Sequence, residues 1–148
     1  MQKKLLAAMT RALFDTDLVA SRIILAMAEF LWAILLLWPG ETFGRPTYKI
    51  MSHVMAEEAW GLVFLMSGVA QITIVLSEIF HSMFAKVFAG WNAMLWVYVV
   101  ASMLLSVYPP PAAISGEMAL AVAATWIWIR PYIIYEGIVR ARQQHSRF

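Results

Sequence analysis

Four polar side chains interrupt the long apolar stretches of this chain: Glu29, Gln71, Glu78 and Asn92. Within hydrocarbon, an ionised side chain costs ~3 kcal/mol or more unless it is paired, faces water or takes up a proton. Carboxyl and carboxamide groups can hold a proton, bond across helices or line a water-filled path. We therefore take these four as the candidate pore or intramembrane polar residues.

A count of depth along each apolar segment, at ~1.5 Å per residue, sorts the polar residues into two levels. Glu29 and Gln71 fall near the middle of a membrane. The inner third receives the other group, namely Arg22, Glu78, Lys86, Asn92 and Arg130. In this group, Arg22 or Arg130 is expected to form an intramembrane ion pair with Glu78, as a clamp between helices.

Glu29 has no basic residue at its own depth, because Arg22 lies seven residues away on the same helical face, about 10 Å along the axis. Three alternatives remain open for this carboxyl. It is protonated, it hydrogen-bonds Gln71 or a neighbouring subunit, or it faces water in a pore or cavity.

The elements that must position these groups are four apolar segments, over residues 18–38, 59–80, 87–108 and 112–135. Each is close to the ~20 residues with which an α-helix crosses a bilayer. The chain is 62% hydrophobic and 14% charged, with a mean hydropathy of +0.72, which is far from the composition of a soluble domain. The sequence predicts one integral membrane domain over residues 1–148, an all-α, four-helix transmembrane bundle.

Positive charge is distributed unevenly between the two ends of these segments. Of eleven Lys and Arg, two, Arg45 and Lys49, lie between the first and second segments, which leaves nine on the opposite side. The nine are Lys3, Lys4, Arg11, Arg22, Lys86, Arg130, Arg140, Arg142 and Arg147. Cytoplasmic segments carry such an excess, so we expect both termini in the cytoplasm and an anionic inner leaflet as a partner.

The flanking segments have signatures of their own. Residues 2–14 place apolar and basic residues on opposite arcs, which predicts an amphipathic helix lying in the interface, with Asp15 and Asp17 capping the next helix. Residues 48–55 are expected to form a short surface helix, and residues 136–148 a cytoplasmic tail. Tryptophans such as Trp32, Trp60 and Trp96 are expected in the interfacial aromatic belt.

Small residues mark where helices can approach one another closely. Such positions recur along three of the segments: Ala26, Ala33, Gly61, Gly68, Ala119 and Ala123. In lipid, helix association depends on close packing at small residues, so these six are the predicted oligomer-packing positions. A homo-oligomer is the expected assembly.

Several classes of chemistry are missing from the sequence. It has no Cys, no glycine-rich phosphate loop and no zinc-protease or serine-hydrolase motif. The three histidines, His53, His81 and His145, do not have the spacing of metal or haem ligands. We therefore expect no enzyme, no cofactor, no metal and no nucleic-acid partner.

Residues 57–65 (EEAWGLVFL) resemble a segment of small four-span membrane proteins encoded by tailed bacteriophages and prophages, in which an acidic residue and Trp-Gly open the second span. The resemblance implies a viral or prophage origin and a bacterial inner-membrane location. It implies no catalytic residue, because that family has no settled activity. The four-span DoxX-like proteins are similar in length and topology alone.

Two functions are compatible with these features. The first is a homo-oligomeric inner-membrane protein that forms a pore or modifies the host membrane in a holin-like manner, with Glu29, Gln71 and Glu78 on the water path. The alternative is a non-conducting structural or adaptor subunit that docks a cytoplasmic or virion partner.

Overall fold

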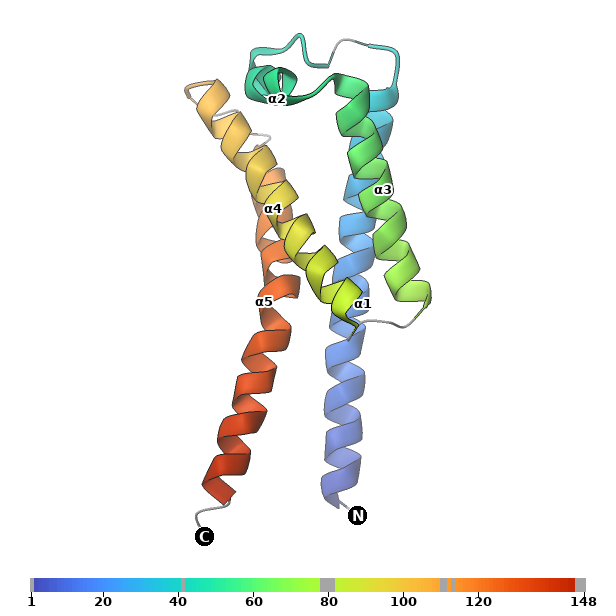
Figure 1. Ribbon diagram of the computed structural model, residues 1–148, viewed down its shortest axis with the longest axis vertical. Coiled ribbons are helices and arrows are strands. Elements are labelled where there is room, and N and C mark those ends of the chain that lie inside the picture. Colours follow the sequence, from blue (N-terminus) through green and yellow to red (C-terminus); the bar gives the residue numbers. More distant parts are fainter. Residues whose placement is uncertain (1, 41, 78–81, 110–111, 113, 146–148) are drawn as a thin grey trace.

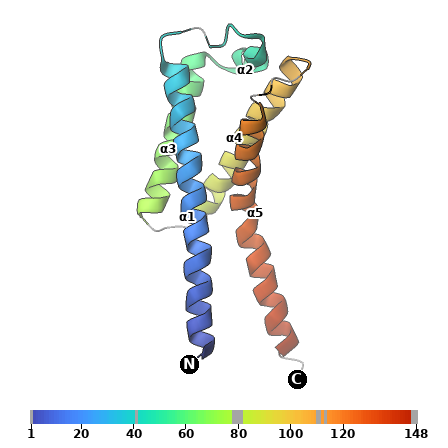
Figure 2. The ribbon, with the colours of Figure 1, turned by 180° about the vertical axis from the view of Figure 1, so that it is seen from behind.

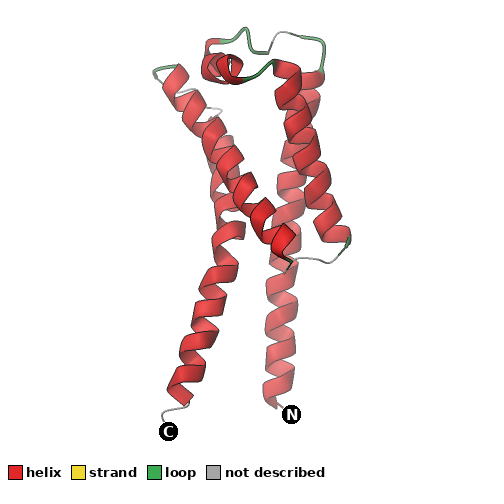
Figure 3. Ribbon diagram, viewed as in Figure 1, coloured by secondary structure: helices red, strands yellow, loops and turns green. Residues whose placement is uncertain are grey.

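The computed structural model describes residues 2–40, 42–77, 82–109, 112 and 114–145, with side chains described between residues 18 and 130 and at 133. These ranges contain five α-helices and one 3-10 helix, joined by loops, and the described residues contain no strand (Figure 3). The order is α1 (Gln2–Leu37), η1 (Pro46–Tyr48), α2 (Lys49–Val54), α3 (Glu57–Leu76), α4 (Met83–Ser106) and α5 (Ile114–His145). The predicted all-α class is confirmed.

Three helical segments in the described part of the chain are long and apolar enough to cross a membrane. They are Leu18–Leu37 of α1, all of α3 and all of α4, with mean hydropathies of 2.0, 1.9 and 1.6. The 20 residues of the first two and the 24 of α4 match the thickness of a hydrocarbon core. The length and hydropathy of these three helical segments therefore indicate a protein that integrates into a membrane.

The N-terminal region differs from the prediction, because α1 runs without a break from Gln2 to Leu37. The expected separate helix over residues 2–14, capped at Asp15 or Asp17, is wrong. No Gly or Pro lies between residues 2 and 37, and an Asp or Thr inside a helix costs less than ~1 kcal/mol. Such a cost is too small to end a helix that continues directly into a strongly apolar segment.

The long helices pack as two pairs, α1 with α3 and α4 with α5 (Figures 1 and 2). Two glycines of α3 allow the close approach within the first pair. A Cβ at Gly61 would lie 2.7 Å from Cγ of Leu37, and one at Gly68 would lie 3.0 Å from the ring of Phe30. Helix α4 runs obliquely, so that its first residues lie beside α1 and its last residues near the start of α5 (Figure 1).

The two pairs are joined by a cluster of aromatic rings, which we define as the buried Trp32, Trp60, Phe64 and Trp96 together with the half-buried Tyr98. The rings of Trp32 and Trp96 meet edge to face at 6.2 Å, and those of Trp60 and Tyr98 stack at 5.4 Å. Trp32, Trp60 and Trp96 are at most 8% exposed. They form the core, because large rings fill the space between the two helix pairs, and their predicted level at the membrane interface stays a prediction.

At the end of the bundle opposite the termini, the predicted short helix over residues 48–55 is confirmed as α2, which directly follows η1. Met51 anchors it, since its side chain is fully buried and its carbonyl accepts a hydrogen bond from Nε1 of Trp60 at 3.1 Å. The Glu57 carboxylate stabilises the loop after α1 by accepting hydrogen bonds from the backbone amides of Thr42 and Phe43, each at 3.1 Å.

Tyr48 lies half-buried in this cap, against the rings of Trp32 and Phe43. Burial raises the pKa of Tyr48, and the negative charges of Glu117 and Glu57 add to the rise, while Arg45 opposes it. The phenol is therefore held neutral where the loop, α3 and α5 meet.

Candidate functional site

A stripe of buried residues on α1 faces the rest of the bundle and carries two ionisable groups. Arg22 is 3% exposed and Glu29 is 0% exposed, with Leu25, Ala26 and Ala33 completing the stripe. The spacing of three, four and seven residues places all five on one face of a helix. The polar face of α1 is therefore enclosed by the chain itself.

Arg22 is held by groups from two other helices. Its Nη1 donates to Oε1 of Gln71 on α3 at 2.7 Å, and its Nη2 donates to the carbonyl oxygen of Ala85 on α4 at 3.4 Å. Gln71 is 1% exposed. The first bond is short and charge-assisted, which makes it a strong polar contact within the α1/α3 pair, while the longer second bond reaches across to the α4/α5 pair.

Glu29 lies about 10 Å further along α1, where Asn92 and Trp96 of α4 face its carboxyl group. Asn92 is 1% exposed and Trp96 is 0% exposed. Within the described residues, five polar atoms of these three side chains have no hydrogen-bond partner at standard geometry: Glu29 Oε1, Glu29 Oε2, Asn92 Nδ2, Asn92 Oδ1 and Trp96 Nε1. We call these three residues the Glu29 cluster.

The pairing of levels differs from the one predicted by counting depth. Arg22 of α1 contacts Ala85 of α4, and Glu29 of α1 faces Asn92 of α4. The second contact lies seven residues after the first on each helix. Asn92 therefore lies at the level of Glu29, which differs from the prediction, whereas the contacts of Gly61 with Leu37 and of Gly68 with Phe30 place Gln71 between the levels of Arg22 and Glu29. The count assumed that each span starts at the membrane surface, whereas the packing of α1, α3 and α4 sets their register.

The predicted ion pairs of Arg22 or Arg130 with Glu78 involve a residue outside the described ranges. Arg130 on α5 is 5% exposed and interacts within the protein. Lys86, one residue after Ala85, is exposed. The two arginines within predicted spans thus point inward, and the lysine points outward.

The small residues divide into two groups. Ala26, Ala33, Gly61 and Gly68 are buried inside the chain, where they bring α1 and α3 together. On α5, Ala119 is exposed and Ala123 is half-buried. In this conformation, only the α5 positions of this set are accessible to another molecule.

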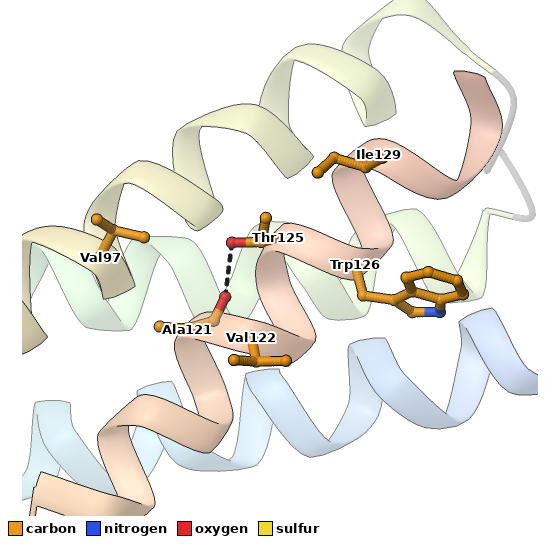
Figure 4. Close-up of a pocket in the computed structure, with 6 residues that line it drawn as sticks. All are labelled: Val97, Ala121, Val122, Thr125, Trp126 and Ile129. Atoms are coloured by element: carbon orange, nitrogen blue, oxygen red, sulfur yellow. Dashed lines mark hydrogen bonds between the residues drawn. The ribbon is translucent and has the colours of Figure 1, made fainter. Parts of the chain in front are cut away.

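The same helix borders a shallow apolar groove of about 320 Å³ (Figure 4). Its lining comes from α4 and α5: Val97, Ala121, Val122, Thr125, Trp126 and Ile129. The one hydroxyl among them, on Thr125, donates to the carbonyl oxygen of Ala121 at 2.7 Å (Figure 4). The groove therefore offers an apolar surface and no reactive group.

Sequence reasoning missed the role of Trp96, which it placed with the interfacial aromatics. The signal was present, since Asn92 and Trp96 are four residues apart and so share a helical face. The bond between Trp91 and Ser67 was also not predicted: Nε1 of Trp91 donates to Oγ of Ser67 at 3.4 Å, a further bond between α4 and α3.

The chemistry available here is proton exchange and hydrogen bonding. Within the described residues, no group of three or more His, Cys, Asp or Glu side chains could hold a metal ion. Comparisons with protein-family models, with curated proteins and with solved structures find no match to this chain.

Proposed function

We propose that this protein is a non-conducting membrane subunit of the bacterial inner membrane, which docks a cytoplasmic or virion partner at the end that carries both termini. The observation behind this proposal is the enclosure of the polar residues. Glu29, Gln71 and Asn92 are each at most 1% exposed in a single chain. A water path that these residues lined would have to pass through the closed interior of one subunit.

The outward surface of the bundle supports the same proposal. Each long helix exposes large apolar side chains, represented by Leu31, Met66, Met94 and Val122, all at least 66% exposed. Copies joined through such faces would enclose an apolar lumen, which water enters poorly. Self-association through α5 is compatible with this proposal, and conduction between subunits is not.

The docking platform consists of the ends of α1 and α5 that lie beyond α3 and α4. Arg22 lies level with the start of α4, so about 20 residues of α1 project past that point, a length of ~30 Å. The end of α5 projects on the same side, and the two termini lie at the same end of the molecule (Figures 1 and 2).

The platform is rich in basic residues. Five lie in the projecting helical segments: Lys3, Lys4, Arg11, Arg140 and Arg142. Positive segments are retained in the cytoplasm, which supports both termini being inside, with α5 as a fourth span. The partner we propose is an acidic cytoplasmic or virion protein, and the viral resemblance of residues 57–65 favours one encoded by a phage.

Two measurements test this function. Purified protein in liposomes should release no more ions than empty vesicles, in the wild type and in Glu29→Ala. In gently solubilised native membranes, the chain should migrate with a second protein. That complex should be lost when Lys3, Lys4 and Arg11 are changed to Glu, and kept when the opposite end is altered by Arg45→Glu. A uniform conducting ring of this chain alone would overturn the proposal and favour the holin-like pore.

A further inference from the structure

We propose that the Glu29 cluster is a proton-binding site, and that the proton on Glu29 holds the α1/α3 pair against the α4/α5 pair. The ligand is a proton, which needs no cavity. This inference goes beyond the docking function, because it concerns the geometry of the bundle whether or not a partner is bound.

The proposal follows first from the donors and acceptors that the cluster contains. Asn92 supplies one amide donor group and one acceptor, Trp96 supplies one donor, and none of these atoms has a partner in the described residues. A neutral carboxyl group can donate to Oδ1 of Asn92 while its other oxygen accepts from Nδ2, and Nε1 of Trp96 can donate to the same group. An ionised carboxylate can only accept, which leaves Oδ1 of Asn92 buried without a donor.

The charged groups around Glu29 do not favour its ionised form. On α1 the nearest cation is Arg22, two helical turns away and bonded to Gln71 and Ala85. Helices α3 and α4 present uncharged groups at this level, and the side chains that act on the Glu29 carboxyl are those of Asn92 and Trp96, both uncharged. A carboxylate at 0% exposure, whose neighbours among the described residues are uncharged, is strongly disfavoured against the protonated acid.

The position of the cluster links its proton to the arrangement of the helices. Glu29 belongs to the α1/α3 pair, while Asn92 and Trp96 belong to the α4/α5 pair. The aromatic contacts of Trp96 with Trp32 and Phe64 lie on the same seam, with ring centroids 6.2 and 5.6 Å apart. Loss of the proton would place an uncompensated charge in this seam and draw water into it. The pairs would then separate, and the projecting ends of α1 and α5 would change their spacing.

The absence of cysteine from the chain makes the test direct. Spin labels at Thr10→Cys on α1 and Gln143→Cys on α5 report the distance between the projecting helices in lipid nanodiscs. We expect the distance distribution of the otherwise wild-type protein to change in one transition as the pH rises. Glu29→Gln, which imitates the protonated acid, should keep the low-pH distribution at every pH. The matched control Glu58→Gln removes an exposed carboxyl and should retain the full response.

Two further measurements keep the proposal testable if Glu29→Gln folds poorly. Trp96→Phe keeps a ring but removes the N–H that can stabilise the carboxylate, so it should move the transition to higher pH. The infrared spectrum of the wild type at neutral pH should contain the C=O band of a protonated carboxyl. A distance unchanged across the pH range, a Glu29→Gln protein that responds like the wild type, or the absence of that band would overturn the proposal.

Discussion

Replacing Gln71 by Leu should leave the Arg22 guanidinium without its best acceptor. The Arg22 to Gln71 bond is 2.7 Å long, whereas the bond to the Ala85 carbonyl is 3.4 Å and therefore weak. Interhelical hydrogen bonds in bilayers are worth ~0.6 kcal/mol on average and ~1.7 kcal/mol at most. This bond is short, buried and charge-assisted, so we place its coupling free energy near the upper end, at ~1.5 kcal/mol.

The single and double variants should differ in a characteristic way. Gln71→Leu strands a charge that is 3% exposed and should lower the free energy of unfolding by ~2–3 kcal/mol. Arg22→Met strands only a neutral amide and should cost ~1–2 kcal/mol. The double variant replaces both partners by apolar groups and should cost ~1.5 kcal/mol less than the sum of the two single variants, because a matched apolar pair leaves nothing unsatisfied.

Reversible unfolding in mixed micelles, followed by tryptophan fluorescence, gives the four free energies of this cycle. A coupling of ~1.5 kcal/mol corresponds to about a tenfold change in the unfolding equilibrium constant. The control cycle combines Gln71→Leu with Thr125→Val, since the Thr125 hydroxyl bonds only within its own helix, and its effects should add. If the Arg22 and Gln71 variants are also additive within ~0.5 kcal/mol, the structural account of Arg22 is refuted.

Three further outcomes are expected. In thermal unfolding, Gly68→Ala should destabilise the α1/α3 pair by ~1–3 kcal/mol, because the added Cβ would lie 3.0 Å from the Phe30 ring. Gly40→Ala is the control and should be neutral, because a Cβ at that position meets nothing within 4 Å. Glu57→Gln should speed hydrogen exchange at the two loop amides that its carboxylate accepts from, without affecting the middle of α3. The pKa of Tyr48 is raised in the folded state, so the neutral phenol should contribute stability that is complete below the ordinary tyrosine pKa of ~10. That stability should be lost as the pH rises through the pKa of Tyr48 in the folded protein. Tyr48→Phe should remove this dependence from the free energy of unfolding measured against pH.

The sequence allowed the helices to be predicted because apolar length is a strong signal. The predicted segments over residues 59–80 and 87–108 correspond to α3 and α4 within a few residues at each end. The prediction from sequence was wrong where the signals that end a helix are weak. Asp15 and Asp17 have the composition of a helix cap, but without Gly or Pro nearby the helix continues through them.

The polar residues of the candidate site could be identified from the sequence, but not their partners. A polar residue in an apolar segment is conspicuous, which is why Glu29, Gln71 and Asn92 were found. Their pairing depends on the axial offset between helices, which is fixed by contacts such as Gly68 against Phe30. No pattern within a single helix carries that offset.

The division of the long helices into pairs follows the order of the chain, and this has a consequence for biogenesis. Residues 2–76 contain all of the first pair, and residues 83–145 contain all of the second. Each half is a helical hairpin that can enter the membrane and close on itself before the other half is synthesised. The polar and aromatic seam would then form last, by docking of two inserted hairpins. Two separately expressed halves, divided in the link between α3 and α4, should therefore reassemble in the membrane.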